Sequence, residues 1–229
     1  MKGEQIPLSV QLRSAASFDT YHAGPNGAAL DALRALHRGG LYLYGPPGTG
    51  KTHLLQAAAR TSQQRGQRVS YLPLRELIAS GAEALDGLSD FALLCIDDLD
   101  AIEGDLDWNH ALIRLLDRLR TEGSAWCLSA AAAPDRLATL LPDLRTRLAA
   151  VPLFGLRALS DEDRRLWLRA AAHQRGLELP DDAARWLIHH QPRDAGSLLA
   201  AIDVLDRASL RDKRRLTLMF VQKTLQQSA

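Results

Sequence analysis

One stretch of the chain combines glycines, prolines, a lysine and a threonine in an order that suits phosphate binding. It comprises eight consecutive residues, Gly45, Pro46, Pro47, Gly48, Thr49, Gly50, Lys51 and Thr52. The stretch follows an apolar run and precedes a helical pattern, which is the setting that a phosphate-binding loop requires. Backbone N–H groups of such a loop point at phosphate oxygens, while Lys51 would contact the β- and γ-phosphates and Thr52 would bind Mg²⁺. The alternative is a Gly-Pro-rich turn that precedes a helix by coincidence.

A pair of acidic residues meets the second requirement of such a site, a carboxylate near the metal. Asp97 and Asp98 directly follow the apolar run 91–96, as the acids of a Walker B strand do. We expect Asp97 to hold Mg²⁺ through water and Asp98 to polarise an attacking water, although an aspartate reaches less far than a glutamate. The alternative is that both are solvated acids after a strand. Asp100 and Asp105, further along, are expected in a solvated loop.

Five short apolar runs alternate with amphipathic stretches and are predicted to be strands. They are residues 41–44, 68–72, 91–96, 125–130 and 151–156. Trp108 and several leucines and alanines recur at helical spacing, which predicts an amphipathic helix over 107–121. This alternation is typical of βαβ units. The expected core is therefore an α/β fold with a five-stranded parallel sheet.

After about residue 158 the strand pattern stops and helical patterns replace it. We expect helices at 160–175, 181–190, 194–210 and 217–227, which would form a small all-helical lid. Arg211, Lys213, Arg214 and Arg215 form a basic run, expected in a solvated lid loop, with local contact to DNA or a partner as the alternative. These patterns divide the chain into three expected parts: an N-terminal segment over 1–20, an α/β core over 21–158 and the lid over 159–229.

Composition restricts the classes of partner. Of 229 residues, 28 are basic and 27 acidic, and the net charge of +1 provides no broad basic field for DNA. No apolar run reaches the roughly 18 residues of a membrane span, and neither cysteine has a partner at metal-ligand spacing. We therefore expect a soluble cytoplasmic protein, without a membrane partner, in which Cys95 and Cys127 are buried thiols.

Several segments together resemble one family. They are 97–100 (Asp-Asp-Leu-Asp), 141–148 (Leu-Pro-Asp-Leu-Arg-Thr-Arg-Leu), 159–163 (Leu-Ser-Asp-Glu-Asp) and 205–210 (Leu-Asp-Arg-Ala-Ser-Leu), the last followed by Leu216-Thr217 and Phe220-Val221. Over roughly residues 4–225 the chain is similar to the DnaA-related AAA+ family, and most of all to its Hda group of DnaA inactivators. The resemblance implies ADP or ATP with Mg²⁺ as cofactors, bound in the crevice between core and lid.

The resemblance also implies a role for Arg147, which aligns with the arginine finger of the family. An arginine finger enters the nucleotide site of a neighbouring subunit, where its guanidinium stabilises charge on the γ-phosphate. For a chain of this group the neighbour would be DnaA, and a homo-oligomer is a second arrangement. Two alternatives stay open, because Arg147 could be a surface arginine at a helix end and Arg145 is the nearest competitor for the role.

The N-terminal segment resembles the peptide by which the Hda group binds the DNA polymerase sliding clamp. Ile6, Leu8 and Val10 would lie in an apolar pocket of the clamp, while Gln5 would hydrogen-bond at the rim of that pocket. Contact with DNA would then be indirect, through the clamp. Without the family resemblance, the same residues predict only a disordered N-terminus.

Two departures from the family pattern bear on hydrolysis. Ser129 is followed by four alanines where the family's first sensor segment carries a polar residue. In the lid, Gly196 stands where related proteins often have a sensor arginine, and Arg193 is the nearest substitute for contact with the nucleotide. We therefore expect nucleotide to be bound more readily than hydrolysed, with weak or no intrinsic ATPase activity.

The function implied by the resemblance is negative regulation of chromosome replication initiation. A nucleotide-bound protein, tethered to the clamp near the nucleoid or replisome, would promote hydrolysis of DnaA-bound ATP through Arg147. DnaA itself carries a helix-turn-helix domain after its lid, which we do not expect here. One alternative is a self-hydrolysing AAA+ helicase loader, which would need both sensors and a helicase-binding segment. Another is a transposition-type, DNA-bound ATPase, which would need a basic face.

Overall fold

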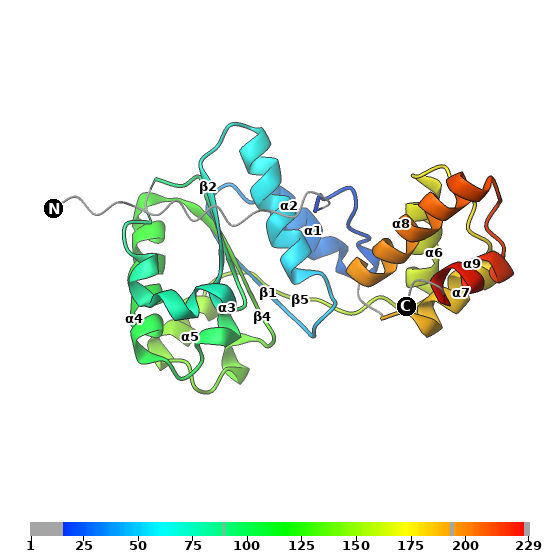
Figure 1. Ribbon diagram of the computed structural model, residues 1–229. Helices are drawn as coiled ribbons and strands as arrows, with labels where there is room; N and C mark the ends of the chain where they lie inside the picture. The colour runs from blue at the N-terminus through cyan, green and yellow to red at the C-terminus, as the bar shows by residue number, and fades with distance from the viewer. Residues whose placement is uncertain (1–15, 89, 193–194, 227–229) are drawn as a thin grey trace. The chain divides into compact units, whose positions relative to one another are not determined.

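The computed structural model describes residues 16–226, apart from residues 89, 193 and 194. The chain divides into two compact units, of which the first ends at Arg157 and the second begins at Ala158. The first unit is an α/β core, and the described part of the second consists of helices and their connections (Figure 1).

A five-stranded parallel sheet forms the centre of the core. Its strand order is β2-β3-β4-β1-β5, so the first strand lies between the fourth and the fifth. The strands are β1 (Gly39–Tyr44), β2 (Val69–Pro73), β3 (Leu93–Asp97), β4 (Ala125–Ala130) and β5 (Leu153–Gly155). The predicted fold class is therefore confirmed: each of the five apolar runs overlaps one strand, and no strand end differs from the prediction by more than two residues.

Helices cover both faces of the sheet (Figure 1). On one face lie α1 (Gly27–Ala35) and α2 (Lys51–Gln64), and on the other lie α3 (Leu74–Leu77), α4 (Leu106–Glu122) and α5 (Pro142–Ala149). Short 3-10 helices connect them: η1 (Gly24–Asn26), η2 (Ile78–Ser80), η3 (Ala82–Leu85), η4 (Leu99–Ile102) and η5 (Pro134–Arg136). The predicted amphipathic helix over 107–121 corresponds to α4. No described helix is long and apolar enough to cross a membrane.

The inner strands β1, β3 and β4 read as apolar runs because side chains on both of their faces are buried. In β1 the side chains of Leu41 and Leu43 join the hydrophobic cluster under α1 and α2, whereas Tyr42 joins the cluster under α4 and α5. Side chains of a strand alternate between the two faces of its sheet, and a parallel sheet with helices on both sides buries each set. All three side chains are at most 2% exposed.

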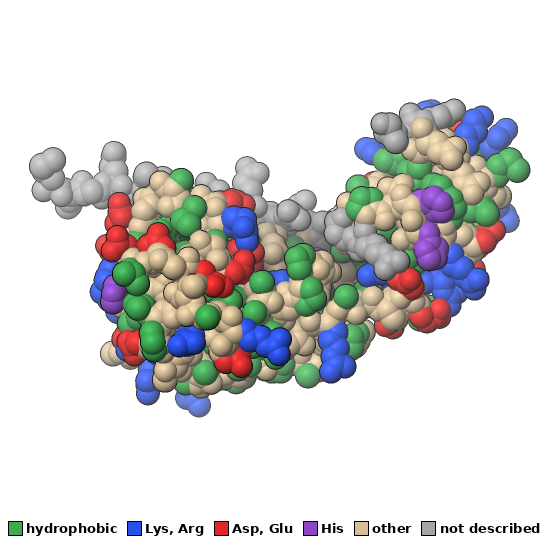
Figure 2. Space-filling view, turned by 90° about the horizontal axis from the view of Figure 1, so that it is seen from below, with side chains coloured by type: hydrophobic (Ala, Val, Ile, Leu, Met, Phe, Trp, Pro, Cys, Tyr) green, Lys and Arg blue, Asp and Glu red, His purple; other side chains and the backbone are tan. Residues whose placement is uncertain are grey.

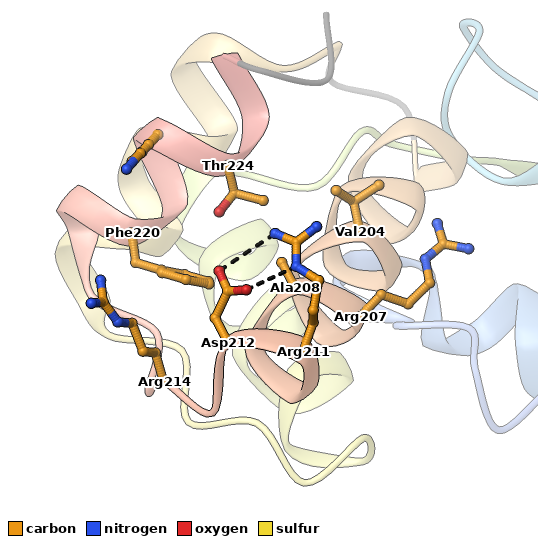
Figure 3. Close-up of a pocket in the computed structure, with 9 residues that line it drawn as sticks. Val204, Arg207, Ala208, Arg211, Asp212, Arg214, Phe220 and Thr224 are labelled. Atoms are coloured by element: carbon orange, nitrogen blue, oxygen red, sulfur yellow. Dashed lines mark hydrogen bonds and ion pairs between the residues drawn. The ribbon is translucent and has the colours of Figure 1, made fainter.

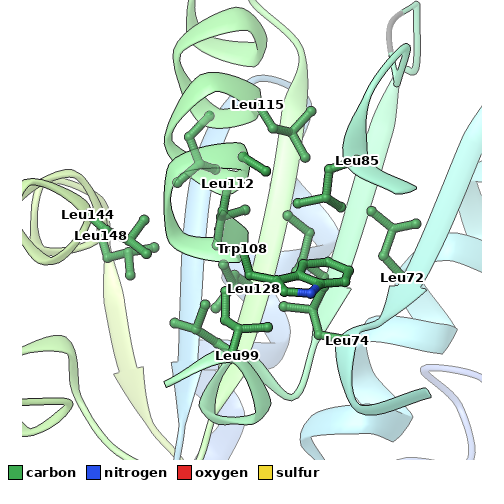
Figure 4. Packing of buried hydrophobic residues seen from close by; sticks show 14 of the residues in the cluster. Leu72, Leu74, Leu85, Leu99, Trp108, Leu112, Leu115, Leu128, Leu144 and Leu148 are labelled. Carbon is green, nitrogen blue, oxygen red and sulfur yellow. The ribbon is translucent and has the colours of Figure 1, made fainter. Parts of the chain in front are cut away.

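The cluster under α4 centres on one face of that helix. Trp108, Leu112 and Leu115 of α4 pack toward Leu128 of β4 (Figure 4), and all four are at most 2% exposed. Truncating such a buried leucine to alanine costs about 2–5 kcal/mol. The spacing that predicted this helix therefore identified the side chains that attach it to the sheet.

The first turn of α4 corrects one expectation. Asp105 does not belong to a freely solvated loop, because its carboxylate accepts hydrogen bonds from the backbone N–H groups of Asp107, at 3.1 Å, and Trp108, at 3.2 Å. It is the N-cap of α4. An N-cap of this kind stabilises a helix by about 1 kcal/mol.

A glycine in β1 makes room for a tryptophan in β4. Gly40 and Trp126 are register partners in the two neighbouring strands. A Cβ atom added to Gly40 would lie 2.2 Å from an atom of the Trp126 indole. The indole is only 5% exposed and belongs to the cluster under α4. The absence of a side chain at Gly40 is therefore what allows the indole to lie where it does.

The two cysteines of the chain also lie in neighbouring strands. Cys95 of β3 and Cys127 of β4 are register partners, and both are free and buried. Burial raises the pKa of the Cys95 thiol. They are therefore the buried thiols that their apolar surroundings predicted.

The lid unit consists of four described helices around a hydrophobic cluster of its own. Their bounds are α6 (Asp161–His173), α7 (Asp181–His190), α8 (Ala195–Asp212) and α9 (Leu218–Gln226). The cluster includes Trp167 of α6 and Leu187 of α7, and Ser160 caps α6 by accepting from Asp163 N. All four predicted helices are found, and no helix end differs from its prediction by more than two residues.

Candidate functional site

The glycine-rich loop joins the end of β1 to the start of α2. Lys51 is the first residue of α2, and Gly50 before it has φ +90°. Gly48 has φ +80°, so two positions of the loop adopt the left-handed conformation that glycine tolerates best. The N–H groups of the first helical turn have no helical partners, and they face an anion with the positive end of the helix dipole. The loop therefore has the backbone of a phosphate site.

At two positions of the loop, steric crowding also requires glycine, because neighbouring atoms leave no room for a Cβ atom. A Cβ atom on Gly45 would lie 2.5 Å from the carbonyl oxygen of Leu156, and one on Gly50 would lie 2.6 Å from the ring of Tyr21. Neither backbone nor a packed ring can yield by that much. The loop is therefore confined between the segment after β5 and the segment before α1.

The side chain of Lys51 folds back over the loop. Its Nζ donates hydrogen bonds to the carbonyl oxygens of Gly45, at 2.6 Å, and Pro46, at 3.2 Å. The hydroxyl of Thr49 donates to the same Pro46 carbonyl at 2.9 Å. Burial lowers the pKa of Lys51, and the nearby charge of Asp97 opposes this shift. The ammonium group therefore lies within the loop and near the acids at the end of β3 and just after it.

Asp97 is a buried carboxylate that accepts three hydrogen bonds. It is 1% exposed, and its Oδ2 accepts from the hydroxyl of Tyr71 at 2.6 Å. Its Oδ1 accepts from the hydroxyl of Ser129 and from the backbone N–H of Asp98, the latter at 3.1 Å. The sequence pointed to Asp97 but to neither Tyr71 nor Ser129 as its donors. Parallel pairing of β2, β3 and β4 brings both hydroxyls to the carboxylate.

Asp98 has a different environment from its neighbour. Its φ of +58° is left-handed, and its carboxylate lies 3.5 Å from Nε of Arg75. The same guanidinium lies 3.0 Å from Asp100, whose other oxygen accepts from Ala131 N. Burial raises the pKa of Asp98, Asp97 adds to the rise and Arg75 opposes it. Asp98 is therefore held by an arginine bridge, and Asp100 belongs to the same network rather than to a solvated loop.

The side chains that the structure describes do not form a metal site without further ligands. The described residues include no cluster of three or more His, Cys, Asp or Glu side chains that could hold a metal ion. Mg²⁺ is commonly held by one or two carboxylates together with water and substrate phosphates. Asp97 and the Thr52 hydroxyl fit that mode, in which phosphate oxygens complete the coordination.

A segment before α1 packs beside the loop, and no motif in the sequence pointed to it. The Tyr21 hydroxyl donates to the carbonyl of Thr49 at 3.3 Å. Asn26 is 4% exposed, and its amide nitrogen donates to Tyr21 Oη at 3.2 Å and to the Arg157 carbonyl at 2.9 Å. His53 of α2 contacts the carbonyl of Ser17 at 2.9 Å. Residues 17–26 are thus attached to the loop and to the end of the core.

Arg147 lies on α5, on the opposite face of the sheet from α2 (Figure 1). Its Nε and one terminal nitrogen pair with the two oxygens of Asp117 on α4, at 2.8 and 2.9 Å. Its other terminal nitrogen pairs with Asp143. These hydrogen bonds raise the pKa of Arg147 further. Arg145 differs, because its Nε is buried and has no partner among the described residues.

Other predicted site residues lie outside the described part of the chain. These are the proposed clamp-binding residues Gln5, Ile6, Leu8 and Val10, and Arg193, the proposed substitute for a sensor arginine. Their roles stay predictions.

The fold and the loop together define a P-loop protein of the AAA+ class, with a parallel sheet, a phosphate loop after β1 and an acidic residue at the end of β3 in the Walker B position. Residues 16–153 match the family model of the bacterial DnaA ATPase domain. Residues 161–225 match the model of the Hda lid domain. The chain belongs to the DnaA-related AAA+ family.

Solved structures agree with this assignment at the level of the fold. Domain III of the Thermotoga maritima replication initiation protein DnaA is 21% identical, with a TM-score of 0.74, and the match covers 95% of this chain and 98% of that one. Replication initiator DnaA bound to AMPPCP and single-stranded DNA is 22% identical, with a TM-score of 0.71 over 89% and 69%. The Thermotoga maritima RuvB Holliday junction branch migration motor is 19% identical, with a TM-score of 0.59 over 86% and 64%.

Proposed function

We propose that the loop binds ADP or ATP together with Mg²⁺. The N–H groups of residues 45–52 and the Lys51 ammonium would hold the phosphates, while Thr52 and Asp97 would hold the metal, Asp97 through water. The support lies in the loop's left-handed glycines, the half-buried lysine and the hydrogen-bonded carboxylate. Two of the similar DnaA structures carry AMPPCP, which favours an adenine nucleotide.

The same site supports binding more than intrinsic hydrolysis. Asp98 is the candidate to polarise water, but its carboxylate is engaged by Arg75 at 3.5 Å. The polar group near the end of β4 is Ser129, and its hydroxyl is buried and donates to Asp97. Neither side chain is free to orient an attacking water. We infer an intrinsic ATPase rate that is low or zero.

The function that fits best is a regulator of replication initiation that inactivates DnaA in trans. The observation that carries this proposal is the combination of a DnaA-type ATPase core with an Hda-type lid in one chain. In the proposed mechanism the guanidinium of Arg147 enters the nucleotide site of ATP-bound DnaA. It stabilises charge on the γ-phosphate, and hydrolysis leaves inactive ADP–DnaA.

The N-terminal residues would supply the second contact of this regulator. Gln5, Ile6, Leu8 and Val10 would bind the DNA polymerase sliding clamp, as the sequence resemblance implies. Tethering to a clamp on DNA raises the effective concentration of the regulator near its target. Stimulation of DnaA should therefore depend on DNA-loaded clamp.

The deciding experiment measures phosphate release by ATP-bound DnaA with and without this protein and DNA-loaded clamp. We expect strong stimulation only when both are present, and little phosphate release from this protein alone. A variant with Gln5, Leu8 and Val10 changed to alanine should lose clamp binding in gel filtration while its affinity for ADP is unchanged. Rapid ATP turnover by this protein alone, without an effect on DnaA, would instead identify a self-hydrolysing loader.

A further inference from the structure

The lid contains a basic groove that the proposed function does not use. It lies between α8 and α9, has a volume of about 750 Å³ and is lined by nine residues: Val204, Arg207, Ala208, Arg211, Asp212, Arg214, Phe220, Lys223 and Thr224. We call it the lid groove (Figure 3). Every residue that lines it belongs to the lid unit, so the groove is a property of the lid alone.

Charge is concentrated around this groove. The segment 207–223 carries six basic side chains (Arg207, Arg211, Lys213, Arg214, Arg215 and Lys223) and one acidic side chain, Asp212, although the whole chain has a net charge of only +1. On the face shown in Figure 2, by comparison, basic and acidic side chains of the core are interspersed. The lid groove is therefore a local site for an anion on a protein without a broad basic face.

The single carboxylate of the lid groove is already neutralised. Asp212 pairs with Arg211, Nε to Oδ1 at 2.8 Å, and this pairing lowers the pKa of Asp212, with smaller contributions from Arg214 and Lys223. No carboxylate among the described residues pairs with Arg207, Arg214 or Lys223. Three cations of the groove are thus available to an external anion.

The position of Arg214 is set by the backbone. The basic run was expected in a solvated loop, but α8 continues to Asp212 and includes its first residue. The turn that follows is fixed by Ser209, whose hydroxyl donates to the Arg214 carbonyl at 2.6 Å and whose carbonyl accepts from Arg214 N at 3.2 Å. Arg214 and Arg207 lie on opposite sides of the Arg211–Asp212 pair (Figure 3).

An aromatic ring forms part of the groove wall. Phe220 of α9 is half-buried against the lid cluster, and its ring points toward Ala208 and Asp212 of α8 (Figure 3). Val204 and Ala208 continue the apolar surface along α8. A ring flanked by cations is the arrangement by which proteins bind single-stranded nucleic acids, with a base on the ring and phosphates on the cations.

We infer that the lid groove binds a short single-stranded segment of nucleic acid, with one base against Phe220 and phosphates at Arg207, Arg214 and Lys223. A duplex would keep its bases stacked and could not place one on the ring. An acidic peptide would satisfy the cations but would leave the ring and its apolar surroundings unused. Recognition through phosphates and one stacked base would depend little on sequence.

The experiment measures anisotropy of a labelled oligothymidylate titrated with the full-length protein, with saturating ADP and Mg²⁺ so that the phosphate loop is not available. We expect binding whose affinity falls with salt at a logarithmic slope of about −2, for three phosphate contacts on a single strand. Changing Arg207, Arg214 and Lys223 to alanine should weaken binding at least about tenfold. Phe220→Leu, which keeps an apolar side chain, should weaken it about tenfold through lost stacking.

A matched control removes the same charge from elsewhere on the lid. Arg169, Arg175 and Arg185 are exposed, do not line the groove and lie outside the segment 207–223, so changing these three to alanine should alter affinity less than about threefold. Equal losses in the two triple variants would overturn the groove assignment. Unchanged binding by Phe220→Leu, or displacement of the oligonucleotide by polyglutamate at equal charge concentration, would overturn the assignment to nucleic acid.

Discussion

Arg147 and Asp117 form a two-point ion pair between α5 and α4, with nitrogen–oxygen distances of 2.8 and 2.9 Å. The geometry is the fork by which an arginine binds a carboxylate or a phosphate. Because Asp143 takes the remaining terminal nitrogen, all three nitrogens of the guanidinium are engaged within this chain. A γ-phosphate bound by Arg147 would therefore have to replace at least one of these carboxylates.

The first prediction concerns release of that pair. Asp117→Asn removes the charge that holds the Arg147 fork, so displacement by a phosphate should be easier. We expect stimulation of DnaA ATP hydrolysis to rise roughly two- to fivefold, as suits an exposed ion pair. Phosphate release under single-turnover conditions measures the effect. A loss as large as that of Arg147→Ala would show instead that Asp117 positions the arginine for its role.

The second prediction concerns Arg147 itself. Arg147→Ala should keep ADP binding and clamp binding but lose most stimulation of DnaA, because the lost group acts only on the partner's phosphate. Arg147→Lys should restore little, since a single ammonium does not reproduce a planar fork. Arg145→Ala should be much milder, but its half-buried side chain makes it a poor control for surface charge. Arg114→Ala, an exposed change on α4, is a better one. Full stimulation by Arg147→Ala would exclude the finger.

The third prediction concerns Lys51. Lys51→Ala should weaken ADP and ATP binding about 10- to 100-fold in calorimetry, which corresponds to the free energy of one hydrogen bond to a charged group. Its circular dichroism spectrum should be unchanged. Because burial lowers the pKa of Lys51, the wild-type affinity should fall as pH rises, at a pH below the ordinary lysine value of about 10.4. Arg65→Ala, at the other end of α2, should retain wild-type affinity. Equal affinities of Lys51→Ala and the wild type would exclude the loop as the phosphate site.

The fourth prediction concerns Ser129. Ser129→Ala removes one of the hydroxyl donors to Asp97 and leaves a buried carboxylate oxygen with a single N–H partner. We expect a loss of about 1–3 kcal/mol in the free energy of unfolding by urea and weaker dependence of nucleotide affinity on Mg²⁺. Ser80→Ala, at an exposed position, should change neither. Wild-type stability of Ser129→Ala would mean that this hydrogen bond contributes nothing net.

The fifth prediction concerns thermal stability at acidic pH. Nε2 of His53 contacts the Ser17 carbonyl, and burial lowers the His53 pKa. A histidine with a lowered pKa in the folded state contributes stability above its unfolded pKa, near 6.5, that is lost as pH falls through the folded pKa. On acidification, the melting temperature of His53→Gln should therefore fall about 2–4 °C less than that of the wild type. The exposed His37→Gln should not, and parallel profiles for all three proteins would contradict the assignment.

The elements of the fold were predictable because their signals are local. A strand buried on both faces is a continuous apolar run, and α4 presents its apolar side chains at helical spacing. The five strands and the large helices could therefore be placed from the sequence alone. The loop from Gly45 to Thr52 was recognisable for the same reason. Its required glycines and its lysine lie within eight consecutive residues of the chain.

The surroundings of the site were not predictable, because they depend on strand order. Tyr71 and Ser129 reach Asp97 only because β3 lies between β2 and β4, and no local pattern marks either hydroxyl. The arginine bridge from Arg75 to Asp98 joins residues more than twenty positions apart. The Arg147–Asp117 pair likewise depends on how α5 packs beside α4, which sequence periodicity does not specify.

The close fit of Gly40 and Trp126 has a consequence for how this sheet can evolve. Because an added Cβ would lie 2.2 Å from the indole, any larger residue at position 40 requires a smaller one at position 126, and a change at either position alone would be selected against. The two positions should therefore vary together among relatives, although they are separated by most of the core sequence. Where the glycine is lost, we expect the tryptophan to be lost with it.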